Sequence, residues 1–425
     1  MSSSSVHSGP AAPDFPPGAA GGTTGPSLWE RMLLVCVVLL LASSYVSIAV
    51  NSLALGACAL LWAAAMIRER RWGVSATPLD WCFAAYAGAE ILSSIFSADP
   101  AQSFTLARRV LLVGIVYLLA STVGTRRRLQ MLAVVLLASA AAVGTLGVGK
   151  LAFGNPVENT RLGIFQFYMT TSELMMIGVL LLAPFTVHPG TPWRIRAACV
   201  AGLVPVLVSL YATVTRGSYL AAAGGLVFIA LARRPRVLLP LLVLFAAVLV
   251  FAPPYVRSRI ESIVDFSHHE NASRLMLWKT GLRMFADHPL VGIGDIDMHE
   301  LYLRYAEEGD PAQHGHFHNV AVQFLVTLGI AGFAAVAALF VQIVRTEWRI
   351  YRRVRDDWFG GSLVLGSLAV FVGFHVSGLT EWTFGDQEIV TLFWITVGFA
   401  LAAEKTALPL KEDHGHPHGG DARPE

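Results

Sequence analysis

Long apolar runs, separated by short polar or arginine-rich segments, follow one another along nearly the whole chain. A hydrocarbon core about 30 Å thick needs roughly 20 apolar residues per helix, and lipid offers backbone polar groups no partner. Such runs therefore predict transmembrane helices, about twelve in all. The predicted ranges are 30–49, 52–67, 79–97, 107–124, 129–152, 169–187, 196–213, 218–232, 237–253, 319–344, 360–379 and 388–403.

The predicted helices divide the chain into five regions. Residues 1–27, rich in Ser, Gly, Pro and Ala, are expected to form a disordered tail. Residues 28–253 carry the first nine helices, 254–318 form one large polar loop, and 319–403 carry the last three helices; a His-rich tail follows at 404–425. The predicted fold class is an all-α polytopic membrane protein whose one large loop contains amphipathic helices.

Composition agrees with this class. Hydrophobic residues make up 55% of the chain and charged residues only 14%, with a mean hydropathy of +0.58, which excludes an ordinary soluble domain. The four cysteines all lie inside apolar runs, so neither a disulfide framework nor a thiolate zinc site is expected.

Charge sets the expected orientation. When the spans alternate, most arginine clusters fall on one side of the membrane, which the positive-inside rule assigns to the cytoplasm together with both termini. These clusters are Arg68–Arg71, Arg126–Arg128, Arg194 with Arg196, Arg233–Arg236 and Arg345–Arg355. The large 254–318 loop then faces the opposite side. Arg108 and Arg109 are the exception, since they fall at the outer end of their predicted helix.

Arg216 is the first candidate for chemistry. It lies in Thr215-Arg216-Gly217, between two predicted helices on the outer side, where the positive-inside rule disfavours arginine. A guanidinium there is suited to grip a lipid pyrophosphate with paired hydrogen bonds. An arginine that merely reaches the lipid headgroups is the simpler alternative.

Arg274 opens a predicted helix in the large loop, after an N-cap at Asn271, where helix N–H groups also favour an anion. An apolar face is predicted from Leu275, Trp278, Leu282 and Phe285. Asp287-His288-Pro289 ends the helix, and a Leu-Val-Gly-Ile-Gly turn follows to Gly294. A helix lying on the bilayer with solvated charges is the competing interpretation.

Histidines end the loop, in His314-Gly-His316-Phe-His318-Asn319, where the chain re-enters the membrane. A histidine near its ordinary pKa of about 6.5 can take a proton from a hydroxyl at neutral pH. A metal site that uses His316, His318 and the Asp295–His299 stretch is the rival hypothesis.

These residues together resemble the O-antigen ligase and polymerase superfamily of bacterial inner-membrane glycosyltransferases. His318-Asn319 is followed after nine residues by Gly329 and then by Gly332, which matches the family's histidine motif. The Arg274 segment and its Gly-Ile-Gly turn, and the Arg216-Gly217 turn, resemble two further family signatures, as does Gly378-Leu-Thr-Glu-Trp-Thr-Phe-Gly-Asp. The detailed similarity covers about residues 210–390.

The resemblance implies a GT-C-like enzyme of the inner membrane that acts on the periplasmic face without a cofactor or metal. It implies that His318, Arg216 and Arg274 are catalytic. Arg161, His316 and Asn319 are expected to contact substrate. The expected donor is a glycan on undecaprenyl pyrophosphate, the expected acceptor is lipid A–core, and membrane lipids surround both.

The single dominant outer loop favours the ligase over the polymerase, which extends glycan on its carrier lipid. A protein O-oligosaccharyltransferase is a further alternative. A transporter is the alternative from another class, since about twelve helices are also common there. Mid-span charge is sparse, however, with Glu90 and Glu173 the main exceptions, and no internal repeat is visible.

Overall fold

The computed structural model describes residues 27–70, 73–154, 161–263, 265, 267–307 and 315–407. Within these ranges the regular elements are all helices, from α1 to α16 with two short 3-10 segments. The predicted all-α class is therefore confirmed. The two predicted tails lie outside the described residues, except for Ser27 and residues 404–407, and α16 continues to Thr406.

Each of the twelve predicted spans overlaps a helical segment, but among the described residues eight such segments are long and apolar enough to cross a membrane. They are α2 (Ile48–Glu69), the composite segment Pro100–Thr122, α6 (Arg126–Phe153), α7 (Tyr168–Val187), α8 (Trp193–Ala212), α14 (Val320–Val354), α15 (Trp358–Ser377) and α16 (Gln387–Thr406). The other four predicted spans form shorter or more polar helices: α1 (Leu28–Ser43), α3 (Asp80–Ile95), α9 (Arg216–Arg233) and α10 (Leu238–Phe251). The chain is a multi-pass membrane protein.

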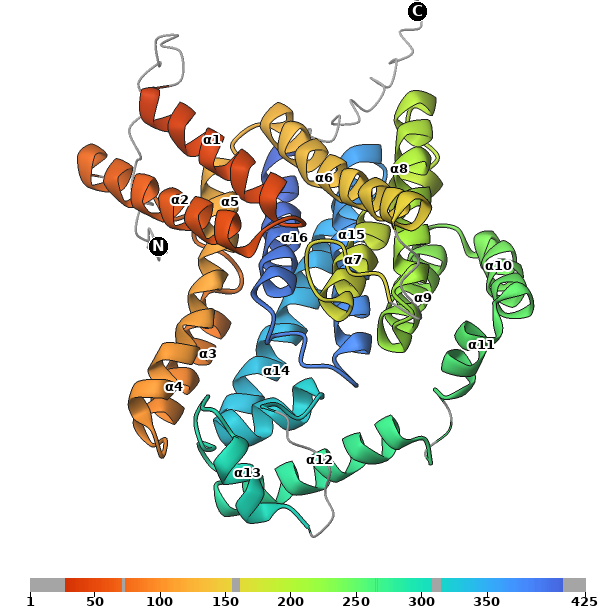
Figure 1. Ribbon diagram of the computed structural model, residues 1–425. Coiled ribbons are helices and arrows are strands. Elements are labelled where there is room, and N and C mark those ends of the chain that lie inside the picture. The colour runs from red at the N-terminus through yellow and green to blue at the C-terminus, as the bar shows by residue number, and fades with distance from the viewer. Residues whose placement is uncertain are drawn as a thin grey trace, which may run out of the picture.

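Helices α7, α15 and α16 form the centre of the bundle (Figure 1). More than three quarters of the apolar window of each is buried. A helix that is apolar on all sides has no face suited to water, so it is stable when other helices surround it. The outer helices α2 and α8 bury far less of their surface, as expected for lipid-facing helices.

The segment Pro100–Thr122 is a chain of three elements rather than one regular helix. Asp99 caps α4 (Pro100–Ala107) by accepting a hydrogen bond from the Gln102 amide at 3.0 Å, and proline is favoured at the first helical position. A 3-10 segment, η1 (Arg108–Val113), follows and leads into α5 (Gly114–Thr122). The stretch 98–106, which the predicted spans left as a connecting turn, is therefore helical from residue 100 onward, because the aspartate and proline start a helix there.

Helix α14 is broken at Gly329, whose backbone (φ 64°, ψ −171°) lies in a region open essentially to glycine. The turn that follows α12 fills the break. Ile293 donates its amide to the Val326 carbonyl at 2.9 Å, and Ile330 donates to the Pro289 carbonyl at 2.8 Å. A Cβ on Gly329 would approach the Leu290 carbonyl to 2.4 Å. Two motifs that are separate in the sequence thus form one structure.

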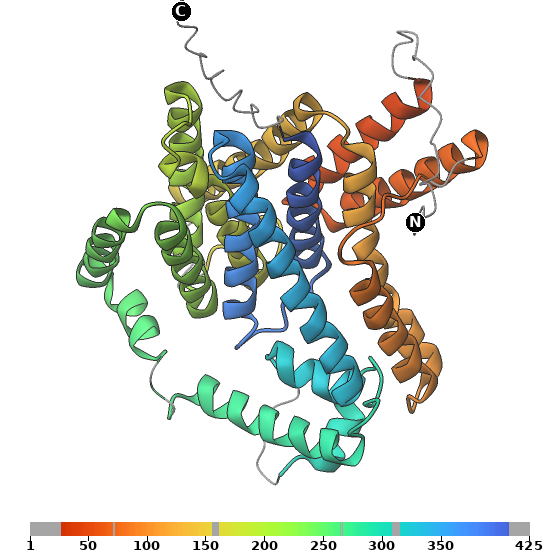
Figure 2. The same cartoon turned by 180° about the vertical axis from the view of Figure 1, so that it is seen from behind.

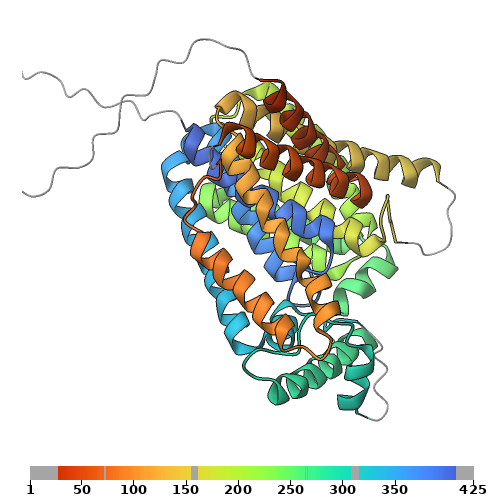
Figure 3. The ribbon, with the colours of Figure 1, turned by 90° about the vertical axis from the view of Figure 1, so that its left-hand side faces the viewer.

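The described part of the predicted large loop is mostly helical and contains α11 (Pro254–Glu261), α12 (His269–Asp287) and α13 (His299–Tyr305). Figures 1 and 2 show α12 and α13 crossing one end of the bundle, beside the start of α14. Figure 3 shows α3 and α4 (orange) running along the bundle toward that same end. The Ser97 hydroxyl, after α3, donates to the Ile293 carbonyl at 2.8 Å and joins the two regions.

Helix α12 ends at Asp287 as predicted, but it begins at His269, with His268 rather than Asn271 as its N-cap. Its buried face is Leu277, Thr280, Gly281 and Met284. The predicted face is wrong at Leu275 and Leu282, which are exposed. Packing against α14 sets the face, since a Cβ on Gly281 would contact both Phe317 and Val322 at 2.9 Å. Arg274 therefore lies in the second turn, beyond the N–H groups of the helix end.

Arginine ion pairs mark the opposite end of the bundle. Arg126 pairs with Asp357 at 2.5 Å and Arg353 pairs with Glu404 at 2.6 Å. Arg353 lies near the last residue of α14, whose 35 residues span about 50 Å at 1.5 Å per residue. The α12–α13 end and this arginine-rich end are therefore separated by the thickness of a membrane.

Candidate active site

His318 is held in a strained backbone conformation at the start of α14. Its φ of 48° lies in the left-handed region, which non-glycine residues adopt only where the surrounding structure imposes it. Asn319 is the N-cap of α14, and its amide group donates to the Leu379 carbonyl at 2.9 Å. The amide of Val320 donates to the Gly378 carbonyl at 2.8 Å. The α15–α16 connection therefore sets the position of His318.

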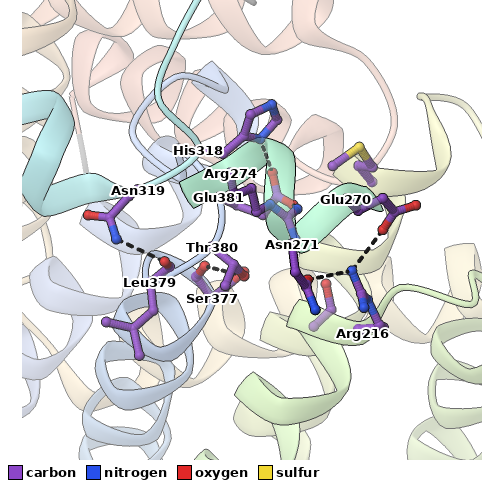
Figure 4. A network of polar contacts seen from close by, with 12 residues as sticks. Arg216, Glu270, Asn271, Arg274, His318, Asn319, Ser377, Leu379, Thr380 and Glu381 are labelled. Atoms are coloured by element: carbon purple, nitrogen blue, oxygen red, sulfur yellow. Dashed lines mark hydrogen bonds and ion pairs between the residues drawn. The ribbon is translucent and has the colours of Figure 1, made fainter. Parts of the chain in front are cut away.

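Glu381, in that connection, bridges His318 and Arg274 (Figure 4). Its Oε2 lies 2.8 Å from His318 Nδ1, and its Oε1 accepts from Arg274 Nη2. The His318, Glu381 and Arg274 side chains are 15%, 14% and 19% exposed, so water screens their charges weakly. When Nδ1 carries the proton, the ring donates it to Glu381 and the basic lone pair lies on Nε2.

Arg216, the first residue of α9, is 7% exposed and faces the same region. Nη1 donates to the Ser262 carbonyl at 2.7 Å, while Nη2 donates to Glu270 at 2.8 Å and to Asn271 at 3.1 Å. Val214, two residues earlier, has a φ of 52°, which is a strained conformation for a β-branched residue. The turn between α8 and α9 thus aims the guanidinium at the α11–α12 connection.

Three arginines from separate elements converge on Glu270. Besides Arg216, Arg259 of α11 donates to Glu270 at 2.8 Å and 3.1 Å, and Arg161 lies 3.9 Å from it. Burial raises the pKa of Glu270, but the hydrogen bonds and charges of the three arginines outweigh burial and lower that pKa to about 2. Arg161 also lies over the ring of Tyr168, 4.5 Å from its centroid.

These groups line one cavity of about 190 Å³, which we call the arginine cavity. Its charged lining consists of Arg161, Arg216, Arg259, Arg274, Glu270, Glu381 and His318. Four guanidinium groups against two carboxylates suit this cavity to an anion, and the carboxylate of Glu270 is the anionic group on which three of them converge.

A second cavity, of about 550 Å³, is also lined by His318 and Glu381. We call it the acidic cavity. Its other charged or titratable lining residues are Arg109, Glu173, Asp295, Asp297, His316 and Asp386. The His316 ring lies 4.2 Å from that of His318. The His318–Glu381 pair therefore lines both a cavity rich in arginine and a cavity rich in carboxyl groups.

The structure brings four of the six predicted site residues, His318, Arg216, Arg274 and Arg161, into the arginine cavity. His316 lines the acidic cavity instead. Asn319 lines neither cavity, and both groups of its side chain bond the backbone, which makes it a support for His318.

Sequence reasoning missed Glu381, Glu270 and Arg259. Glu381 lies within the Gly378–Asp386 motif, which the sequence analysis recognised, but the sequence did not show which residues Glu381 contacts. Glu270 precedes Arg274 by four residues on α12, a spacing that by itself fits an ordinary ion pair on the helix surface and gives no sign of the three arginines that reach it.

The rival metal hypothesis placed ligands at His316, His318 and Asp295–His299. Across the described part of the chain, which leaves out His314, no three His, Cys, Asp or Glu side chains are grouped to hold a metal ion. Asp297 instead accepts the His299 amide at 3.1 Å, and Asp295 pairs with Arg109 at 3.5 Å.

Comparison with known proteins found one match to a protein family. Residues 201–337 match the family model described as O-antigen ligase (Wzy_C). No curated protein matches the chain. The matched span holds Arg216, Arg274, His318 and the break at Gly329, whereas Arg161 and Glu381 lie outside it. The family motifs and the cavity therefore coincide, and the match over residues 201–337 supports membership of the O-antigen ligase and polymerase superfamily.

Proposed function

We propose that this protein is an O-antigen ligase, a glycosyltransferase that moves a glycan from undecaprenyl pyrophosphate to a sugar hydroxyl of lipid A–core. One observation carries the proposal. Three arginines from separate parts of the chain converge on a single carboxylate position, beside a histidine held by Glu381 and Arg274. An anion site next to a general base is what displacement of a pyrophosphate by a hydroxyl requires.

The pyrophosphate of the donor binds in the arginine cavity. Arg216 and Arg274 neutralise the charge that builds on it as the glycosidic bond breaks, an effect that is strong where water is excluded. Arg161 and Arg259 extend the same positive surface. Phosphate oxygens there compete with Glu270 for the guanidinium groups, so the arginines remain compensated before the donor arrives and after it leaves.

His318 takes the proton of the acceptor hydroxyl. The hydroxyl oxygen attacks the anomeric carbon, a new glycosidic bond forms with inversion, and the bond to the pyrophosphate breaks. Undecaprenyl pyrophosphate leaves with the electron pair, and the proton stays on His318 until water or the product phosphate takes it. Glu381 is a positioning residue that orients the imidazole and stabilises its protonated form. No metal takes part in this step.

The proposed orientation places the active site in the periplasm and both termini in the cytoplasm. Arg126, Arg233 and Arg353 lie at the end of the bundle opposite α12 and α13, and the positive-inside rule assigns such clusters to the cytoplasm. The membrane is then the bacterial inner membrane, where both lipid substrates meet at the outer leaflet and their sugars enter under α12.

A reconstituted assay tests the function. Purified protein is incubated with lipid-linked glycan and lipid A–core in EDTA, and a gel shift of the acceptor lipid is measured, with His318→Ala as the matched inactive control. Transfer to lipid A–core despite chelation is the expected result.

Two results would contradict the proposal. A ladder of lengths on the carrier lipid, without transfer to lipid A–core, would identify a polymerase. Transfer that appears only after a divalent metal is restored would refute the metal-independent step.

A further inference from the structure

The acidic cavity differs from the arginine cavity in charge. Five carboxylate side chains line it against one arginine: Glu173, Asp295, Asp297, Glu381 and Asp386 face Arg109. Burial raises the pKa of Asp295, and the nearby Arg109 charge only partly offsets this. Carboxyl groups, ionised or protonated, with one arginine among them offer phosphate much less positive charge than the four guanidinium groups of the arginine cavity do. The pyrophosphate is therefore expected to bind in the arginine cavity instead.

Two polar groups on the wall of the cavity lack partners among the described residues. Glu173, 4% exposed, accepts at Oε1 from Ser218 and Ser377, but its Oε2 has no hydrogen-bond partner. The buried hydroxyl of Thr383 also has none. Both residues line the cavity. A buried oxygen without a partner is costly unless a ligand or water supplies the missing donor.

Arg109 reaches the cavity from an irregular segment. It lies in η1, the 3-10 stretch between α4 and α5, and its Nη1 is 3.5 Å from Asp295 Oδ2. A 3-10 stretch inside a longer helix often marks a functional position. The neighbouring Arg108 is exposed, so the irregular turn separates two consecutive arginines and directs one of them inward.

We propose that the acidic cavity binds the saccharide of the acceptor, and that its carboxylates together with Arg109 select an acceptor whose reacting sugar carries no phosphate. The inference rests on the proposed transferase function and adds the acceptor's place and chemical class to it.

Sugar chemistry fits this lining. Hydroxyl groups donate hydrogen bonds to Glu173 Oε2 and to the aspartates, and Arg109 donates to hydroxyl or ring oxygens. Trp382, which packs against Phe324 and Phe384, also lines the cavity and adds apolar surface for the C–H groups of a sugar. His318 stands at the boundary with the arginine cavity, so an acceptor hydroxyl here meets the donor's anomeric carbon beside the base.

Steady-state kinetics with the full-length reconstituted protein test the assignment. The KM for lipid A–core is measured at saturating donor, and the KM for donor at saturating lipid A–core. Arg109→Gln and Asp295→Asn are each expected to raise the acceptor KM about tenfold or more, with the donor KM nearly unchanged. Arg161→Gln is expected to do the reverse. Arg108→Gln, one residue along and exposed, is the matched control and should change neither constant.

A binding measurement separates failure of this inference from failure of the proposed function. Isothermal titration uses inorganic pyrophosphate and a lipid-free core oligosaccharide, the latter before and after enzymatic removal of its phosphates. If the wild type transfers nothing, the inference still stands when the dephosphorylated oligosaccharide binds and Arg109→Gln weakens its binding but not that of pyrophosphate.

Several outcomes overturn the inference. These are an unchanged acceptor KM in both acidic-cavity variants, an equal rise in the donor KM, no oligosaccharide binding, or tighter binding of the phosphorylated form.

Discussion

The arginine cavity and the acidic cavity share His318 and Glu381 but surround them with different groups, guanidinium in one and carboxyl in the other. On one side four guanidinium groups converge, and their partner Glu270 stays ionised because its pKa is held near 2. On the other side carboxylates outnumber Arg109, and burial raises the pKa of Asp295. The difference matches the two ends of a glycosyl transfer, since the leaving pyrophosphate needs positive charge while the attacking hydroxyl needs hydrogen-bond acceptors and a base.

The largest expected effect comes from the residue that the cavities share. His318→Ala should lower kcat by about 10²–10⁴-fold, because the acceptor hydroxyl loses its base. His318→Asn is the second variant, since asparagine tolerates the left-handed backbone at this position and keeps the fold. Near-normal ligation by both variants, at an unchanged melting temperature, would show that the boundary between the cavities is not the reaction centre.

The next effect tests whether the arginine cavity grips its ligand through paired hydrogen bonds. Arg216→Lys and Arg274→Lys keep the charge but lose the planar fork, so each should lower kcat/KM by about 10–100-fold. The measurement is the donor dependence of transfer, and Arg257→Lys on the exposed side of α11 is the control. Full activity of both lysine variants would show that the cavity needs only positive charge and not paired hydrogen bonds.

The smallest effect concerns stability and has opposite signs in the two cavities. The pKa of Glu270 is lower in the folded protein than its ordinary value of about 4.3, so its ion pairs stabilise the fold fully above that value and progressively less as the pH falls toward 2. Glu270→Gln should therefore cost about 1–3 kcal/mol at pH 7, and its deficit should shrink between pH 4 and pH 3.

Asp295 should behave in the opposite way. Its folded pKa is raised by burial, so the ionised form weakens the fold at neutral pH, and stability recovers as the pH falls through the folded pKa. Asp295→Asn should raise the melting temperature at pH 7 even though transfer suffers. Thermal unfolding of both variants in detergent from pH 7 to pH 3 measures the contrast; equal shifts of the same sign would show that the cavities do not differ electrostatically.

Much of the site could be anticipated from the sequence because its motifs are local. Arg216 beside Gly217, Arg274 before the Gly-Ile-Gly turn, and His318-Asn319 at the mouth of a helix are recognisable within short windows. Glu381 could not be assigned, because its function depends on Arg274 and His318, which lie 107 and 63 residues away along the chain. No short sequence pattern predicts a contact between residues so far apart along the chain.

Arg109 and α12 are two further features that the sequence alone did not predict. The sequence left Arg108 and Arg109 as an exception to the charge rule, and only the 3-10 turn of η1 and the position of Asp295 separate their environments. On α12 the apolar spacing favoured a face through Leu275 and Leu282, yet the close approach to Phe317 and Val322 buries the face that contains Gly281. Both outcomes depend on what packs against the helix.

The sequence by itself determined the helices, the membrane class and the family motifs, because apolar run length and short-range spacing act within a few turns of chain. The tertiary structure alone decided how many helices are long enough to cross the membrane, which carboxylate meets which arginine, and how His318 divides two cavities. Those features arise from contacts between segments far apart in the sequence, such as the insertion of the Pro289–Gly294 turn into the break of α14 at Gly329.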